Sequence, residues 1–299
     1  MAAKVILAPT WELAEPIKAD VTVEAEYGAH IKEGKKQTLA HHAGKYKGGP
    51  AVSTMRPKPI SSGTILVSHL DLDTIIACLD LLGMSDKVSD KVREICGYVD
   101  VNGPHRLGDI EISKEDDEKI HAWWATEEAM ERKPRDKITD VTDDIKKAGK
   151  ILGEIMTHEK GHIEKGKKFK EEGEKLEESS FSDTVGDVIV RKSEQFVNHL
   201  YKHDKKVYKG VAALNTKYNS VTVSQERVVP GVSCKDVVQG LWGSEAGGHD
   251  GIAGSPRGKA MTEKDLMDAA KALNEAFKGK GIEKKASVEM DWVGNFLNS

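Results

Sequence analysis

The passage over residues 65–79 constrains the fold more than any other part of the chain. Residues 64–67 are a short apolar run behind a Ser-Ser-Gly turn, which predicts a buried strand. Residues 74–82 are apolar enough to form a helix packed on a sheet, with Asp73 or Thr74 as its cap. The passage therefore predicts a strand that gives way to a helix packed on a sheet.

Three polar side chains, His69, Asp71 and Asp73, occupy alternate positions between this strand and this helix. If the chain stays extended there, all three point in one direction. They then lie at the carboxyl end of a strand, where open α/β sheets form ligand sites. Two carboxylates that converge repel each other unless a cation or protons intervene. The spacing therefore predicts a metal site. The alternative is that the aspartates cap the helix and that His69 is a hydrogen-bonded loop residue.

Length and composition describe the rest of the chain only broadly. A length of 299 residues favours two domains, and a net charge of −4 argues against duplex nucleic acid as a partner. The isolated Cys78, Cys96 and Cys234 form neither a metal motif nor a disulfide framework and indicate a reducing compartment. The apolar run near the N-terminus is interrupted at Pro9, and no apolar stretch reaches transmembrane length. We expect a cytoplasmic protein that does not bind membranes.

Two adjacent histidines, His41 and His42, precede a loop that contains glycines and prolines. They either ligate a metal ion or are solvated. Adjacent residues point apart in regular structure. At most one of the two is therefore expected in a metal shell, unless the backbone turns there.

A second pair of Asp and His residues follows the central passage. Residues 92–99 predict a buried segment with a strand end at Asp100, and an Asn-Gly-Pro turn separates Asp100 from His105. Asp100 could coordinate or bridge a cation beside Asp73, and His105 could ligate it or donate to a phosphate. The alternative is that Asp100 forms an Asx-turn and that His105 is exposed.

Residues 140–178 predict one long charged helix. Its apolar positions keep helical spacing only in the first part, so the later part is expected to link two domains. This helix contains His158, Glu159 and His162, a match to the HExxH pattern of zinc proteases. We discount a protease, because the surrounding Lys and Glu residues indicate a solvated helix rather than one buried at a cleft.

Residues 179–299 are expected to form a second, smaller α/β domain. The patterns predict strands over 187–190, 206–214 and 219–224, helices over 196–201, 234–242 and 262–277, and a last strand and turn over 284–299. Dense glycines over 243–258 let backbone N–H groups approach an anion, and His249, Arg257 and Lys259 could add charged contacts to a phosphate. A flexible glycine loop is the alternative.

Two passages resemble the DHH phosphoesterase superfamily with its DHH-associated C-terminal domain. Residues 65–77, with Ser-His-Leu-Asp-Leu-Asp, resemble the first metal-binding motif of that family. Residues 247–254, Gly-Gly-His-Asp-Gly-Ile-Ala-Gly, closely resemble the Gly-Gly-His signature of its substrate-binding domain. The resemblance covers about two-thirds of the chain, since the strands that precede the second passage also match.

The resemblance implies a two-lobed α/β enzyme with a parallel-sheet metal domain over 1–178, which includes the linker helix 140–178, and a substrate-binding domain over 179–299. It implies two divalent cations, usually Mn²⁺, with Mg²⁺ and Co²⁺ as alternatives. Residues that match the metal motifs would be ligands: His69, Asp71, Asp73 and Asp100. Residues of the second passage and its flank would bind substrate: Gly247, Gly248, His249, Gly254 and Arg257.

The family's Asp-His-His triplet is absent from this chain. We hypothesise either that His105 replaces it or that His41 and His42 serve as ligands from an unusual N-terminal segment. The expected function is hydrolysis of a nucleotide, a short oligonucleotide or another small phosphorylated substrate. Catalytic roles would fall to Asp100 and to His105 or His42. A catalytically inactive nucleotide-binding relative and the less favoured zinc protease are the alternatives, and a homodimer is left open.

Overall fold

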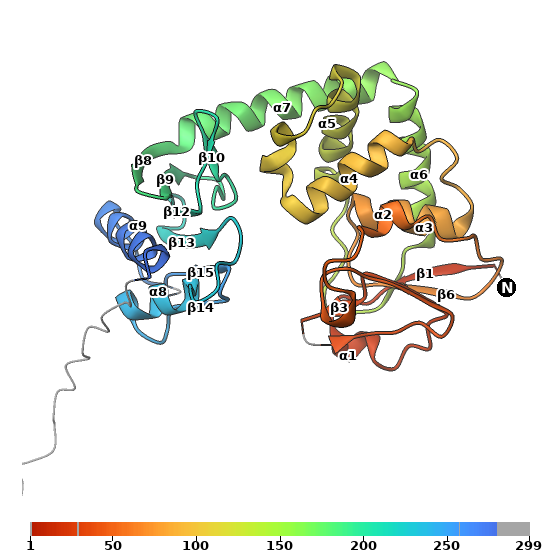
Figure 1. Cartoon of the computed structure of the whole chain (residues 1–299), viewed down its shortest axis with the longest axis horizontal. Coiled ribbons are helices and arrows are strands. Elements are labelled where there is room, and N and C mark those ends of the chain that lie inside the picture. Colours follow the sequence, from red (N-terminus) through yellow and green to blue (C-terminus); the bar gives the residue numbers. More distant parts are fainter. Residues whose placement is uncertain (1, 29, 257, 280–299) are drawn as a thin grey trace, which may run out of the picture. The chain divides into compact units, whose positions relative to one another are not determined.

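The computed structural model describes residues 2–28, 30–256 and 258–279. The chain divides after Glu172 into two compact units (Figure 1). The sequence predicts a boundary at residue 178. Both positions lie inside one helix, α7 Lys160–Ser180. Both units combine sheets with helices, as an α/β chain requires, and none of the helices in the described ranges has the length and apolar character needed to span a bilayer.

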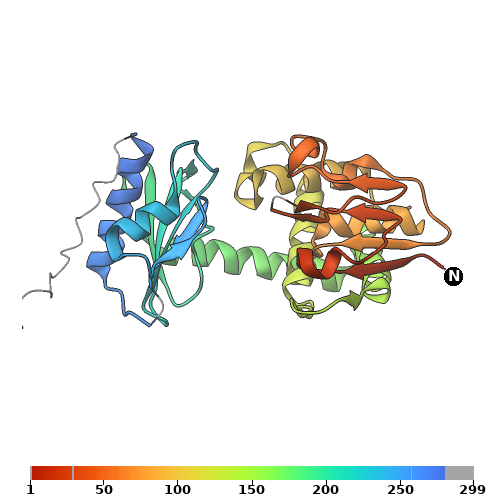
Figure 2. The ribbon, with the colours of Figure 1, turned by 90° about the horizontal axis from the view of Figure 1, so that it is seen from below.

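The N-terminal unit is built on a sheet with the strand order β5-β2-β6-β1-β7. The first four strands in this order run parallel, and β7 is antiparallel to β1. The turned view of Figure 2 shows the strands of this unit side by side. Their bounds are β1 Lys4–Leu7, β2 Val21–Val23, β5 Gln37–Leu39, β6 Thr64–Val67 and β7 Thr139–Asp140, and a separate hairpin joins β3 Glu26–Tyr27 to β4 His30–Ile31.

Helices cover both faces of this sheet, because apolar residues stand at successive positions of its strands. Val5, Ile65 and Val67 pack in the main core with α3, whereas Leu66 packs on the opposite face in a smaller cluster with Ala14 of α1. Figure 1 shows α1 and α3 on opposite sides of β1 and β6. The helices of the unit are α1 Trp11–Ala14, α2 Val52–Met55, α3 Leu72–Leu82, α4 Asp90–Asn102, α5 Lys114–Glu128 and α6 Thr142–Met156, with the 3₁₀ turns η1 Gly44–Tyr46 and η2 Pro104–Asp109.

The predicted strand over 64–67 is confirmed, and two details beside it are wrong. The cap of α3 is Asp71, whose carboxylate accepts a hydrogen bond from the Thr74 N–H at 2.8 Å, so that Asp73 is already in the first helical turn. Residues 92–99 belong to α4 rather than to a strand. Ser89 caps this helix, and the buried Val92, Ile95 and Cys96 follow helical spacing. In so short an apolar run, the spacing alone does not distinguish a helix from a strand.

The long helix expected over 140–178 is two helices, α6 and α7 Lys160–Ser180. They are separated at His158, which has a φ of 61° in the left-handed region. The first part of α7 lies against α5, since a Cβ at Gly166 would meet backbone atoms of Ala122. Leu176 near its end packs with Phe181 in the second unit.

The C-terminal unit has a mixed sheet with the order β14-β15-β13-β12-β9-β8. Among its described strand pairs, β9 with β12 is the only parallel one. The helices α8 and α9 pack with this sheet in one apolar core. The bounds are β8 Phe181–Val185, β9 Val188–Ser193, β12 Gly210–Asn215, β13 Ser220–Gln225, β14 Gly247–Gly248, β15 Ile252–Gly254, α8 Cys234–Trp242 and α9 Glu263–Phe277, and β10 Lys202–His203 pairs with β11 Lys206–Val207.

Several predictions for this unit are confirmed. Helix α8 has its predicted bounds, and α9 begins with a capping box in which Thr262 and Asp265 bond to each other's backbone. Strands β12 and β13 form the predicted hairpin. The helix expected over 196–201 is wrong, because this segment is a loop in which Val197 and Tyr201 pack on the sheet. The strand and turn expected over 284–299 lie outside the described residues.

Arg191 of β9 ties the end of α7 to the C-terminal unit. Its fully buried guanidinium donates to the carbonyl oxygens of Glu177, Leu200 and Lys202 and to the Ser180 hydroxyl. Burial lowers the pKa of this guanidinium, and nearby glutamates favour its charge. A charge held almost entirely by carbonyl oxygens fixes the chain around it in one arrangement.

Candidate metal centre

The carboxyl ends of three neighbouring parallel strands, β5, β2 and β6, meet at one edge of the sheet. Glu24 directly follows β2, His41 and His42 follow β5 after Ala40, and His69 follows β6 after Ser68. Chains that end side by side bring these side chains together although they are far apart in sequence.

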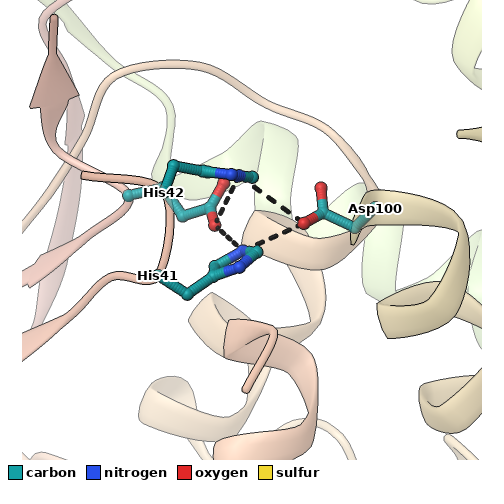
Figure 3. Close-up of side chains that lie close together, drawn as sticks. His41, His42 and Asp100 are labelled. Carbon is teal, nitrogen blue, oxygen red and sulfur yellow. Dashed lines mark ion pairs between the residues drawn. The ribbon is translucent and has the colours of Figure 1, made fainter. Parts of the chain in front are cut away.

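The first group of side chains consists of Glu24, His41, His42 and Asp100. Nε2 of His41 lies 2.7 Å from Oε1 of Glu24 and 2.9 Å from Oδ2 of Asp100. Nε2 of His42 lies 3.5 Å from each of the same two oxygens. Figure 3 shows Asp100, which comes from the last turn of α4, facing the two imidazoles. Glu24 and His41 are buried, whereas 46% of the His42 side chain is exposed.

The second group consists of Glu24, His69 and Asp71. Nε2 of His69 lies 3.2 Å from Oε2 of Glu24 and 3.1 Å from Oδ2 of Asp71. The other oxygen of Asp71 caps α3, and Nδ1 of His69 is 2.8 Å from the Ser68 hydroxyl. His69 and Asp71 are therefore each oriented by a second contact.

Glu24 belongs to both groups, and its two carboxylate oxygens are divided between them. Its backbone is in the left-handed region with a φ of 48°, which is uncommon for a residue other than glycine. The Glu24 N–H donates to Leu39 of β5 at 2.8 Å, and the Ser68 hydroxyl donates to the Glu24 carbonyl. Both neighbouring strands thus hold the residue in this conformation, as is typical of strained backbone at functional sites.

Three buried atoms of the first group have no hydrogen-bond partner within the described residues. They are Oε1 of Glu24, Nε2 of His41 and Oδ2 of Asp100. These atoms are close to each other, but none of the contacts has the geometry of a hydrogen bond. Buried polar atoms without a partner are costly, and atoms that converge on one point suit a shared cation. Imidazole nitrogens with carboxylate oxygens are a donor set that divalent transition metals accept. The residues present therefore fit a metal ion.

Charge in the two groups is strongly coupled. Burial works against ionisation of Glu24, but contacts with His41 and His69 outweigh it and lower the Glu24 pKa to about 2. Burial works against the charged form of His41, but Asp100, Asp73 and Glu24 outweigh it and raise the His41 pKa to about 12. In the same way, Asp71 and Glu24 raise the pKa of His69 to about 10. Positive charge is thus strongly favoured at both places, and protons supply it in the absence of a cation.

Glu26 makes the backbone turn that brings both histidines into one group. Its carboxylate accepts hydrogen bonds from the backbone N–H groups of His41, His42 and Ala43, the last at 2.6 Å. The centroids of the His41 and His42 rings are consequently only 3.9 Å apart. The expectation that only one of the two could face the site applied to a regular backbone, and the backbone turns here.

Asp73 does not point in one direction with His69 and Asp71, as the extended chain would have required. Its oxygens accept hydrogen bonds from the Val52 N–H at 2.8 Å and from the N–H and hydroxyl of Ser53, so that Asp73 holds the start of α2. Oδ2 of Asp73 remains 3.7 Å from Nε2 of His41. Asp73 therefore adjoins the first group.

The remaining predicted residues lie elsewhere. His105 is in η2 and belongs to neither group of the described residues that could hold an ion. His158 precedes α7 and contacts Glu118 at 3.1 Å, whereas His162 contacts Glu154 at 3.1 Å. The two imidazoles of the HExxH match are thus engaged by different carboxylates and do not share one helix.

The Gly-Gly-His passage forms the hairpin of β14 and β15 in the C-terminal unit. Gly248 has a φ of 151°, and a Cβ there would lie 2.4 Å from the Ile252 carbonyl, so packing alone requires this glycine. Gly247 has open space around it, and a Cβ at Gly254 would make only ordinary contacts. His249 is exposed and its N–H donates to Ile252 at 2.7 Å. Arg257 lies outside the described residues.

Comparisons of this chain with models of protein families and with curated proteins find no match. The candidate site is therefore described from the distances, burial and contacts of its own residues.

Sequence reasoning missed Glu24 and Glu26. The signal for Glu24 is that an acidic residue directly follows an apolar strand. The same signal led to the prediction for Asp100. For Glu24 it was hidden because Val-Thr-Val-Glu also fits the alternation of a longer strand, in which the glutamate would be an ordinary solvent-facing residue.

Proposed function

We propose that this chain is a phosphoesterase that depends on two divalent cations and hydrolyses a small phosphorylated substrate such as a nucleotide or a short oligonucleotide. The observation that carries the proposal is the division of the Glu24 carboxylate, with Oε1 toward His41 and Oε2 toward His69. A carboxylate shared between two sets of ligands is suited to a pair of ions, and paired ions are typical of phosphoryl hydrolysis. The resemblance to the DHH phosphoesterases supports the same reaction class.

The chain's own residues divide the work. Bound cations would neutralise phosphoryl oxygens and lower the pKa of an attacking water. Glu24 and His41, both buried, and Asp100 are proposed to hold one cation, and Glu24, His69 and Asp71 the other. The half-exposed His42 is accessible to a substrate, so we assign to it the contact with the leaving oxygen in place of His105.

Mn²⁺ is the proposed cation, with Mg²⁺ and Co²⁺ as alternatives. The full chain is stripped with a chelator, reloaded with each ion in turn, and assayed with bis(4-nitrophenyl) phosphate. We expect no hydrolysis by the stripped protein and recovery with at least one ion. Glu24→Gln and Asp100→Asn should remove the recovered activity, whereas Glu171→Gln, a change at an exposed glutamate of α7, should not.

Two results would overturn the proposal. Hydrolysis that persists after chelation would show that cations are not needed. Calorimetric binding of a nucleotide by the stripped protein, with no hydrolysis after any reloading, would instead favour the inactive nucleotide-binding relative. His158→Ala should leave recovered activity unchanged, because His158 is held by Glu118 outside the proposed site.

A further inference from the structure

A pocket opens beside the candidate metal centre, entirely within the N-terminal unit. Its empty space, which includes open solvent, is about 400 Å³. It is lined by residues of α3, α4 and α5: Asp71, Leu72, Asp73, Cys96, Val99, Asp100, Ile120, Trp124 and Glu127.

The lining divides into an acidic end and an apolar wall. Asp71 and Asp100, which are candidate ligands of the two groups, form the acidic end, so the pocket is continuous with the metal centre. Val99, Ile120 and the half-buried Trp124 form the apolar wall. The Trp124 ring meets His121 edge-on, with ring centroids 5.0 Å apart, which orients its indole.

Glu127 places a carboxyl group in this pocket one helical turn after Trp124. No ion pair of Glu127 with a lysine or arginine is found within the described residues. Burial raises the pKa of Glu127 to about 7, and the Asp71 carboxylate adds to this effect. Glu127 is thus a half-buried hydrogen-bonding side chain beside an aromatic surface.

We propose that this pocket holds a planar heteroaromatic ring of the substrate, with Trp124 against its face and Glu127 hydrogen-bonded to its edge. The inference rests on the proposed function, narrows its substrates to phosphate esters that carry a ring of the nucleobase kind, and assigns the ring to this pocket. Stacking on an aromatic side chain favours any nucleobase, because every base presents a flat π-face.

Other occupants fit the lining less well. A second phosphate would meet the carboxylates of Asp71, Asp100 and Glu127 without a lysine or arginine among the lining residues. A simple alkyl group would offer no hydrogen bond to the half-buried Glu127 carboxyl. A flat ring with N–H or amino groups satisfies both the apolar wall and the carboxyl.

The test measures binding rather than turnover. The Mn²⁺-loaded full chain is titrated by calorimetry with adenosine 5′-monophosphate and with ribose 5-phosphate, which lacks the ring. We expect the ring-bearing compound to bind about tenfold more tightly or better. Trp124→Ala should abolish most of this difference while leaving the affinity for ribose 5-phosphate unchanged, and Trp124→Phe should retain part of it.

Glu127 is tested by the amino group of the ring. Purine riboside 5′-monophosphate lacks that group, so wild type should bind it several-fold more weakly than adenosine 5′-monophosphate. Glu127→Ala should remove this preference and Glu127→Gln should keep part of it, because the amide oxygen still accepts. Glu128→Ala, at the exposed neighbouring position, should behave as wild type.

Metal content and melting temperature are measured for every variant, so that a pocket defect is separated from lost ions or lost folding. Three results would overturn the pocket assignment: wild type binds adenosine 5′-monophosphate and ribose 5-phosphate equally, wild type binds neither, or Trp124→Ala weakens both equally. Hydrolysis of bis(4-nitrophenyl) phosphate could still stand in each case. Ring-selective binding without any hydrolysis would support the pocket and contradict the proposed reaction.

Discussion

Nε2 of His41 lies 2.7 Å from Oε1 of Glu24, and neither atom has a hydrogen-bond partner within the described residues. Both atoms are buried, and they come from the ends of adjacent parallel strands. Burial of two such atoms without a hydrogen bond is costly unless a cation occupies the point on which they converge. This relationship is the physical basis of the predictions that concern metal.

Glu24→Gln should weaken binding at both candidate cation positions. Glu24 contributes an oxygen to each group, and an amide supplies less charge to either ion. We expect the affinity for Mn²⁺ to fall by more than about 100-fold, beyond the effect typical of residues that only orient ligands. Calorimetry and metal analysis check this. Asp71→Asn should affect one position only, so an identical loss in both variants would contradict a shared carboxylate.

Glu26→Ala should weaken cation binding although Glu26 contacts no candidate cation position. Its carboxylate fixes the turn that carries His41 and His42. We expect a loss of affinity of roughly 10- to 100-fold with the number of bound ions unchanged. Glu26→Gln should be milder, since one oxygen still accepts. Equal affinities in wild type and Glu26→Ala, measured by competition with a chelating dye, would refute this role.

Asp73→Ala should destabilise the metal-free protein. Its carboxylate accepts from two N–H groups at the start of α2 and from the Ser53 hydroxyl, all buried. Removing a charged acceptor from buried donors costs roughly 2–4 kcal/mol. Urea unfolding of the chelated protein should show a lower midpoint for Asp73→Ala and a smaller change for Asp73→Asn. Loss of metal with no change in the metal-free midpoint would mean that Asp73 acts only as a ligand.

The metal-free protein should be most stable in mildly acidic solution. Contacts with His41 and His69 lower the Glu24 pKa to about 2, so its contribution is present above pH 4.5 and is lost as the pH falls through 2. Carboxylates of Asp100, Asp73 and Glu24 raise the His41 pKa to about 12, so its contribution is complete below pH 6.5 and declines toward pH 12. Urea midpoints of chelated protein should therefore fall between pH 6 and pH 9. His41→Asn should show a smaller fall, and an equal fall would argue against His41 as the source.

Arg191→Met should destabilise the C-terminal unit and spare cation binding. The guanidinium holds three carbonyl oxygens and a hydroxyl that would lose their donors. We expect a loss of roughly 3–5 kcal/mol in the unfolding of that unit. The matched control is Lys192→Met at the next residue, whose exposed contact with Glu263 contributes at most about 1 kcal/mol. Comparable losses in both variants, by denaturant unfolding, would count against the buried network.

Local sequence determined those elements in which the pattern of apolar residues agrees with a boundary signal such as a turn or a helix cap. The helix over 234–242 and the capped helix that follows Thr262 have apolar residues at helical spacing, and the strand over 64–67 is a continuous apolar run behind a turn. The apolar residues over 92–99 also follow helical spacing, but the run is too short for its spacing alone to distinguish a helix from a strand. The break at His158 also escaped prediction, because one residue in the left-handed region has no pattern of its own.

The sequence by itself also identified most residues of the candidate site, namely His41, His42, His69, Asp71 and Asp100. It did not supply their grouping. That depended on the strand order β5-β2-β6, which places chain ends from distant segments side by side, and on Glu26, which turns the backbone at His41. Glu24 became visible only in the tertiary structure, because facing two groups at once is a property of folded neighbours rather than of spacing along the chain.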